Sequence, residues 1–282
     1  MKKTMNKLLC GLLAGVSVFG SAVMLGGCTT SHPEVEMQIA FNGKTYTLEY
    51  TLYRKFAPNT VTHFLQLADS GYYDGLCVHD YADSKLYTGG YTYDENKTED
   101  GGLVYKSYYD EVKKIENYEH SVWADTEKQV PTYTLYGEFS ANNVKVQNGS
   151  FLKQDFGSLT MYYNEKKEDA YTVTVSHPEA GEDMRDYRYN SATSMFFISI
   201  NSTDVTNNQY CTFATLNAGS VQRLKDLKKD IEDYIDDEND AKTTEKVRID
   251  ADDPVLGDAN KTANYTVLKS PVTIKKVTIK SR

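Results

Sequence analysis

This sequence has no excess of basic residues. It also lacks several other features, and each absence excludes a class of protein. The 282 residues include 31 Lys and Arg against 40 Asp and Glu, which gives a formal net charge of −9. Proteins that bind nucleic acids need a basic surface for the phosphates, so we exclude that class. Four Cys are too few for a fold held together by disulfides. The chain also lacks internal repeats and the Gly-x-Ser-x-Gly motif of many hydrolases. No pair of His has metal-ligand spacing, so we expect no metal site.

Tyrosine, in contrast, is abundant. The chain holds 23 Tyr against 10 Phe and one Trp. A Tyr side chain can bury its ring and keep its hydroxyl in water, which suits strands that face solvent on one side. With 40% hydrophobic and 25% charged residues, the composition is that of a globular protein.

The first 27 residues are typical of an export signal. Basic residues precede an apolar stretch over residues 8–25, which three glycines interrupt and which is too short for a confident membrane span. The run Leu25-Gly26-Gly27-Cys28 resembles the bacterial lipobox, whose Cys receives diacylglycerol. We therefore expect a signal peptide over residues 1–27, a lipid anchor on Cys28, a tether over residues 28–33 and a location outside the cytoplasm at a bacterial membrane. The alternative is an ordinary secretory signal followed by an unrelated Cys.

Two further cysteines, Cys77 and Cys211, stay in the mature chain. They are either small buried side chains or, in an oxidising compartment, the two halves of one disulfide.

Hydrophobic periodicity predicts many strands and two helices. Asn42-Gly43 predicts a tight turn between the first two strands, because both central residues of a type I′ turn need positive φ. One helix begins at Pro58 and ends before Gly71, and a second covers about residues 220–235. The acidic stretch 236–261 is expected to be a loop. The ranges predicted as strands are 35–41, 45–52, 158–163, 195–200, 210–216 and 272–279.

Eight short segments occur in a family-specific order along the chain. They are 57–65, Gly71-Tyr72-Tyr73-Asp74-Gly75, Val78-His79, Gly89-Gly90, 157–161, 190–198, 209–213 and 271–274. In this order they resemble the cyclophilin family of peptidyl-prolyl isomerases. The resemblance implies an all-β fold with two helices: a closed eight-stranded antiparallel barrel, capped by the helices, over residues 34–282. Insertions relative to the family are expected on the surface at about residues 91–132, 164–189 and 236–261.

The resemblance also implies an activity, the isomerisation of Xaa-Pro bonds, which needs no cofactor. The barrier is about 18–20 kcal/mol and comes from amide resonance. A catalyst therefore needs an apolar pocket for the proline ring and a hydrogen-bond donor aimed at the prolyl nitrogen. In the family this donor is an Arg directly after the His of the Val-His strand, and here that position is Asp80. A carboxylate cannot donate, so the active site is degraded and we expect weak activity.

The resemblance assigns the other site positions, most of which are changed here. Phe197 matches the aromatic residue at the base of the proline pocket, and Tyr210 stands where many relatives carry His or Tyr. The candidates for catalytic contacts are Asp80, Thr88, Met195, Phe197 and Tyr210, and those for substrate binding are Lys85, Leu86, Tyr162, Tyr163 and Phe197.

Two arginines in the second insertion, Arg185 and Arg188, are candidates for a relocated donor. The alternative is that they are two solvated loop charges.

Two hypotheses for function follow. The first is a membrane-anchored isomerase, weakly active, that acts on Xaa-Pro bonds of secreted proteins. The second is a non-catalytic module that binds proline-containing or extended segments, or a partner in the cell envelope. Asp80 favours binding, whereas the retained Phe197 favours catalysis. In both cases the expected partners are a polypeptide segment and, through Cys28, a membrane.

Overall fold

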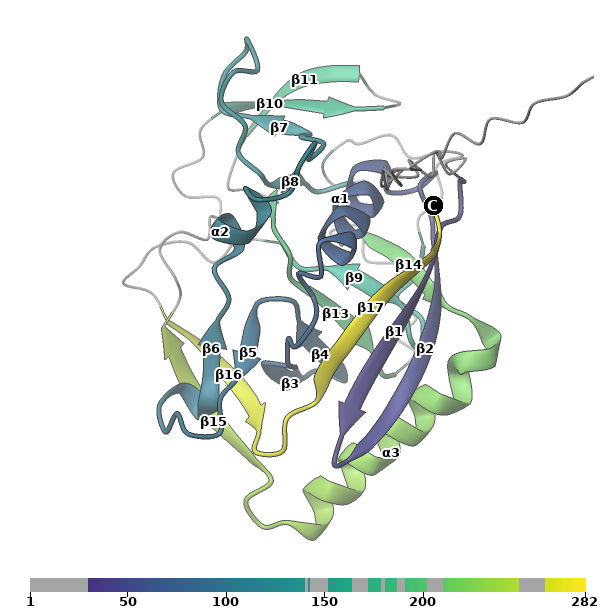
Figure 1. Cartoon of the computed structure of the whole chain (residues 1–282), viewed down its shortest axis with the longest axis vertical. Helices are drawn as coiled ribbons and strands as arrows, with labels where there is room; N and C mark the ends of the chain where they lie inside the picture. The colour runs from purple at the N-terminus through teal and green to yellow at the C-terminus, as the bar shows by residue number, and fades with distance from the viewer. Residues whose placement is uncertain are drawn as a thin grey trace, which may run out of the picture.

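Eight antiparallel strands form the central sheet, in the order β17-β1-β2-β14-β9-β13-β4-β3. The computed structural model describes residues 30–139, 142, 152–163, 172–178, 181–186, 191–201, 210–248 and 262–282. Figure 1 shows the sheet curling around a common interior. Its strands are β1 (Glu34–Phe41), β2 (Lys44–Leu52), β3 (Asp80–Ala82), β4 (Lys85–Thr88), β9 (Leu159–Met161), β13 (Phe196–Ser199), β14 (Thr212–Leu216) and β17 (Thr273–Ser281).

The hairpin of β1 and β2 confirms the alternation that the sequence predicts. Every second side chain from Val35 to Phe41 is at most 1% exposed. Phe41 pairs with Lys44 across a two-residue turn. Both turn residues have positive φ, 44° at Asn42 and 76° at Gly43, as a type I′ turn requires. One face of the hairpin thus closes over the core.

The predicted closed barrel is found as a curled sheet whose edge strands, β17 and β3, do not pair in a ladder. Residues 75–78, which lead into β3, form no strand, yet they reach the start of β17, where Cys77 makes an isolated β-bridge with Thr273. Backbone hydrogen bonds run from Gly75 N to Ile274 O (2.8 Å), from Ile274 N to Leu76 O (2.7 Å) and from Val78 N to Val272 O (2.8 Å). This segment connects the two edges of the sheet.

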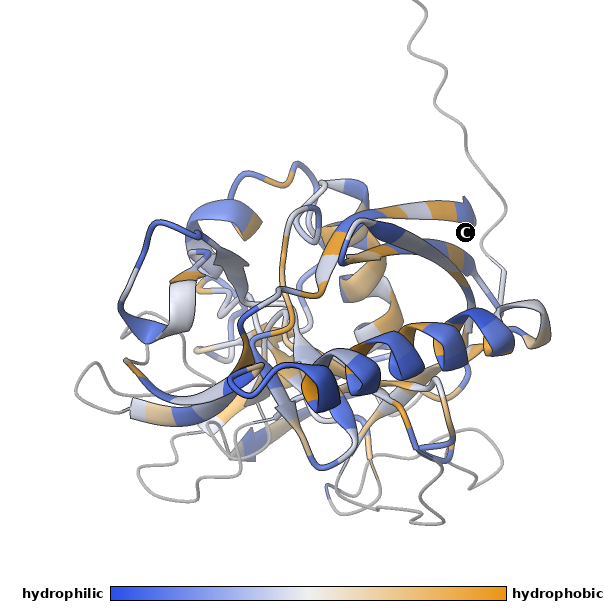
Figure 2. Ribbon diagram, turned by 90° about the horizontal axis from the view of Figure 1, so that it is seen from below, coloured by the Kyte–Doolittle hydropathy of each residue, from blue (hydrophilic) through white to orange (hydrophobic). Residues whose placement is uncertain are grey.

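Both predicted helices are present. α1 (Pro58–Asp69) has Pro at its first position, and its buried face includes Phe64 and Leu65. α3 (Val221–Asp237) buries Leu224, Leu227 and Ile231, and Figure 2 shows hydrophilic residues along its exposed side. Among the residues that the structure describes, no helix is long and apolar enough to cross a membrane.

The insertions carry more regular structure than the sequence predicts. The stretch 236–261 is not simply a loop, since β15 (Lys242–Arg248) lies within it and pairs with β16 (Thr262–Leu268). A third, short helix, α2 (Tyr108–Val112), lies in the first insertion. The remaining elements are β5 (Tyr91–Tyr93), a 3-10 turn (Asp100–Gly102), β6 (Leu103–Tyr105), β7 (Val122–Trp123), β8 (Leu135–Tyr136), β10 (Thr172–His177), β11 (Gly181–Asp186), β12 (Ser191–Ala192) and a 3-10 turn (Ala218–Ser220).

The two remaining cysteines are buried and unbonded. Cys77 and Cys211 are both free thiols. Burial raises the pKa of the Cys77 thiol to about 12, so this group stays protonated and behaves as a small apolar side chain.

The first and last described residues of the chain lie together. Thr30 N donates to Arg282 O at 2.6 Å, and Glu34 pairs with Ser281 at the start of the β1–β17 ladder. Figure 1 places the C-terminus at the opposite end of β17 from the β15–β16 hairpin.

Candidate functional site

Strand β4 presents different residues to its two faces. Lys85 and Tyr87 are partly exposed, whereas Leu86 and Thr88 are 0% exposed. Thr88 Oγ1 donates to Cys77 O at 2.8 Å, inside the protein. We use the word groove for the surface lined by Asp80, Lys85, Tyr87, Tyr162 and Tyr265. The structure does not bring Leu86 and Thr88, two of the predicted site residues, to this groove. It brings Tyr87 there instead, a residue that the sequence analysis missed.

An aromatic cluster surrounds the ammonium group of Lys85. Phe197, on β13, is 0% exposed, and its ring centroid lies 5.2 Å from that of Tyr87 and 5.9 Å from that of Tyr210. Lys85 Nζ lies 4.8 Å from the Phe197 ring centroid and 5.9 Å from those of Tyr87 and Tyr210. These distances are typical of cation–π contacts. Lys85 thus covers the residue that the sequence places at the base of the proline pocket.

Asp80, which the sequence resemblance predicts at the position of the family Arg, is held by the β15–β16 hairpin. Its Oδ1 accepts a hydrogen bond from Thr266 N, on β16, at 2.8 Å. Partial burial raises the pKa of the Asp80 carboxyl, and this hydrogen bond opposes the rise. The neighbouring Tyr265 packs its ring 4.9 Å from that of His79. Strand β16 of the β15–β16 hairpin therefore forms a wall of the groove.

A pocket of about 250 Å³ lies between this hairpin and the strands. His79 is almost fully buried, and burial lowers its pKa to about 3, so its ring is neutral. Asp80 is the one acidic residue among those that line the pocket in the part of the chain described. The lining includes His79, Asp80, Tyr87, Tyr162, Met195 and Tyr265. Tyr87 belongs to this pocket and also to the aromatic cluster around Lys85.

The Gly89-Gly90 pair allows the 194–195 segment to pack closely against it. Gly89 has φ of +99°, and a Cβ there would collide with the carbonyl oxygen of Ser194. A Cβ on Gly90 would overlap the Met195 side chain. The two glycines therefore position Met195 at the pocket.

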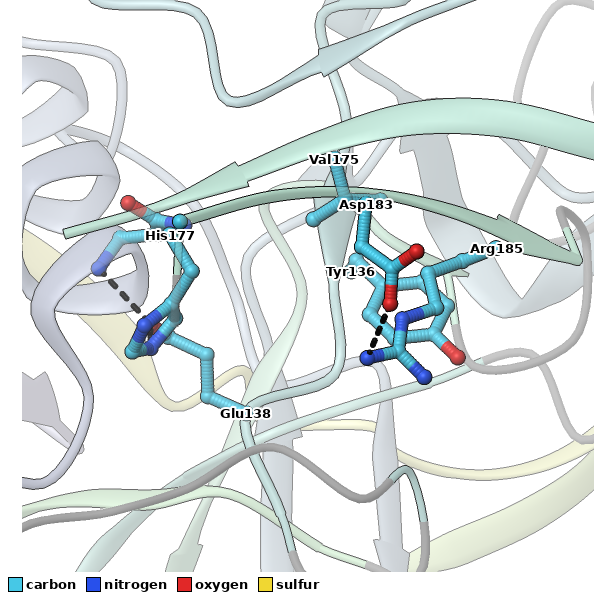
Figure 3. Close-up of a pocket in the computed structure, with 8 residues that line it drawn as sticks. Tyr136, Glu138, Val175, His177, Asp183 and Arg185 are labelled. Atoms are coloured by element: carbon cyan, nitrogen blue, oxygen red, sulfur yellow. Dashed lines mark hydrogen bonds and ion pairs between the residues drawn. The ribbon is translucent and has the colours of Figure 1, made fainter. Parts of the chain in front are cut away.

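Two further predicted residues lie away from the groove. Tyr163 is 2% exposed and packs its ring 5.0 Å from that of Phe139 in the interior. Arg185, on β11, pairs with Asp183 at 2.8 Å, in a separate small pocket that Figure 3 shows beside Glu138 and His177. The structure does not bring Arg185 to Phe197. Arg188 and the lipidation candidate Cys28 lie outside the described residues.

Glu138 supplies a buried carboxylate to the start of α1. Its oxygens accept hydrogen bonds from Asn59 N (3.0 Å), Thr60 N (2.8 Å) and Thr60 Oγ1 (2.7 Å). The His177 Nε2 atom is 3.2 Å from Glu138 Oε1. A negative charge at a helix N-terminus satisfies free N–H groups and interacts well with the helix dipole. This arrangement is a helix cap provided by a distant residue, and the sequence analysis missed it.

In the described ranges, no three side chains of His, Cys, Asp or Glu lie together so that they could hold a metal ion.

The chain matches one family model over most of its length. Residues 35–251 match the model of the family described as "Cyclophilin type peptidyl-prolyl cis-trans isomerase/CLD", so the chain belongs to this family. Its mostly β architecture with few helices is the cyclophilin fold.

The solved structures that are similar to this chain include those of two cyclophilins. A cyclophilin-type isomerase of Cryptosporidium parvum is 17% identical, over 89% of this chain and 99% of that one, with a TM-score of 0.43. The same protein in the presence of the dipeptide Ala-Pro gives 17% identity, coverage of 88% and 99%, and a TM-score of 0.41. The Mimivirus cyclophilin is 12% identical, over 90% of this chain and 91% of that one, with a TM-score of 0.40. No curated protein matches the chain.

Proposed function

We propose that this chain is a membrane-anchored cyclophilin, located outside the cytoplasm, that binds proline-containing segments of secreted proteins and isomerises them only slowly. The observation that carries the proposal is the placement of Asp80. The sequence resemblance assigns Asp80 to the family's donor position, and its carboxylate accepts a hydrogen bond from Thr266 N. No Arg is among the described residues that line the groove pocket. A carboxylate cannot donate to the prolyl nitrogen, and its charge opposes the lone pair that develops there.

A second candidate function is binding without any catalysis, which Asp80 favours because a carboxylate does not donate to the prolyl nitrogen. Lys85 affects both candidates. Its ammonium group lies over Phe197, so a proline ring reaches the pocket floor only after this side chain moves. A contact that must break before binding lowers the apparent affinity for the ligand.

Both candidates are tested by NMR exchange spectroscopy on an Ala-Xaa-Pro peptide mixed with the purified protein. Shifts of the peptide resonances measure binding, and cis/trans exchange measures catalysis. We expect saturable binding with little acceleration of exchange. Exchange as fast as that catalysed by a family member that retains the Arg would contradict slow catalysis. Equally tight binding of a control peptide with Ala in place of Pro would contradict the assigned ligand.

The substitution Lys85→Ala should strengthen binding of the same peptide by about 2- to 30-fold. A cation–π contact stabilises by about 0.5–2 kcal/mol, and this free energy no longer opposes entry of the proline ring. The matched control is Lys113→Ala, because Lys113 Nζ lies 5.5 Å from the Tyr109 ring centroid, away from the groove. Equal affinities of wild type and Lys85→Ala would show that Lys85 does not cover the binding site.

The anchor is tested with Cys28→Ser in bacteria that are fed a labelled fatty acid. We expect this variant to lose the label and to leave the membrane fraction, because serine has no thiol to receive diacylglycerol. Cys10→Ser, within the proposed signal, should keep both. Labelling that survives Cys28→Ser would exclude this residue as the anchor.

A further inference from the structure

We infer that the pocket between strands β3, β4 and β16 binds a basic side chain, Lys or Arg, of the polypeptide that the groove holds. This inference rests on the proposed function, because it names the substrate class for the same groove. Recognition would then depend on a cation beside the proline.

The first argument is the uncompensated charge of Asp80. Among the described residues, only one of its oxygens is engaged, since Oδ1 accepts from Thr266 N, and Asp80 forms no ion pair with any of them. The adjacent His79 is neutral and supplies no positive charge. A half-buried carboxylate without a counter-charge is destabilised by desolvation, and burial accordingly raises the pKa of Asp80. A cationic ligand would remove this cost.

The second argument is the aromatic wall of the pocket. Tyr87, Tyr162 and Tyr265 all line it, and Tyr87 meets Tyr162 edge-on with ring centroids 6.3 Å apart. Tyrosine rings attract cations over their faces and also pack against the methylene stems of long basic side chains. A carboxylate among tyrosines matches both parts of a Lys or Arg side chain.

The third argument is that this pocket adjoins the ring of Phe197, on which the proline is proposed to lie. The ring centroids of Tyr87 and Phe197 are 5.2 Å apart. Tyr87 also lines the pocket of Asp80, and Asp80 pairs with Tyr87 across β3 and β4. An extended segment whose proline lies on Phe197 would therefore place a nearby side chain next to Asp80.

Four fluorescent peptides test the inference by anisotropy at one fixed ionic strength. They combine either Lys or Gln on both sides of the central residue with either Pro or Ala at the centre. With the wild-type protein, we expect the Lys peptides to bind about tenfold or more tightly than the Gln peptides, as for a partly desolvated charge pair. This comparison needs no variant.

The variant Asp80→Asn should abolish most of that preference. Its amide oxygen still accepts from Thr266 N, so the β16 wall is retained while the charge is lost. The matched control is Asp83→Asn, which removes an equal charge from an exposed residue nearby, and this variant should keep the preference. Equal binding of Lys and Gln peptides to the wild type overturns the inference, as does an equal loss in both variants, which would indicate attraction by net charge alone.

The two peptide positions keep the inference separate from the proposed function. Equal binding of the Pro and Ala peptides overturns the proposed preference for proline, while a Lys preference that depends on Asp80 still supports the inference.

Discussion

Replacement of Glu138 by Ala should lower the free energy of unfolding by about 3–5 kcal/mol. The carboxylate accepts hydrogen bonds from Asn59 N, Thr60 N and Thr60 Oγ1, and it is 2% exposed. Each buried donor left without an acceptor costs about 1–3 kcal/mol, and the substitution leaves these donors unpaired at the same helix end. His177 also loses the carboxylate that lies beside it. The start of α1 therefore becomes the weakest point of the helix.

Chemical denaturation measures this effect, with two controls. Glu138→Gln keeps one carbonyl oxygen as acceptor, so we expect it to lose about half as much stability. Glu127→Ala removes an exposed carboxylate and should change stability by less than about 0.5 kcal/mol. If Glu138→Ala were as mild as Glu127→Ala, the cap would contribute nothing to stability.

An Arg at position 80 should create an efficient isomerase from this scaffold. In a protein that also carries Lys85→Ala, Asp80→Arg is expected to accelerate Xaa-Pro exchange by on the order of 10²-fold, the scale of one preorganised donor in other enzymes. The guanidinium supplies N–H groups where the wild type has only acceptors, and removal of Lys85 exposes the ring of Phe197. Exchange spectroscopy at equal protein concentration measures the gain.

The control for this gain is Asp80→Lys in the same background. It changes the charge equally but lacks the planar fork of donors, so we expect a smaller increase. Both variants lose the acceptor for Thr266 N, and the effect of that loss is therefore matched. If neither variant were faster than Lys85→Ala alone, the family's donor position would not correspond to Asp80.

Local sequence signals predicted the main elements of the fold well. Pro58 and Gly71 bracket α1 because each has a conformational preference that acts within one turn. The alternation of β1 likewise follows from its own residues. The β15–β16 hairpin was missed because its buried residues, Val247, Tyr265 and Val267, pack against β5 and β6 residues that are distant in sequence. Polar residues flank these buried residues in the sequence. Without its tertiary contacts, the segment is therefore typical of a loop.

The sequence predicted several residues of the candidate site, but it did not predict which side chains of β4 face the groove and which face the interior. Lys85, Phe197 and Tyr210 do lie together. Leu86 and Thr88 face inward because neighbouring residues of a strand point to opposite sides, so a shift of one residue exchanges the two faces. The pairing of β4 with β13 and with β3 fixes this choice. Glu138 carried no local signal, since it caps a helix 78 residues earlier in the sequence.

The contact between Thr30 and Arg282 decides how an anchored molecule would be oriented. Thr30 is bonded to Arg282, and Cys28 precedes Thr30 closely in sequence. The nine residues of β17, at about 3.3 Å each, lead roughly 30 Å away from that point toward the β15–β16 hairpin. A lipid on Cys28 would thus hold residues 30 and 282 near the lipid headgroups. The β15–β16 hairpin, which forms a wall of the groove, would then point away from the membrane, where polypeptides can reach it. A reporter group fused after Arg282 would lie at the bilayer surface.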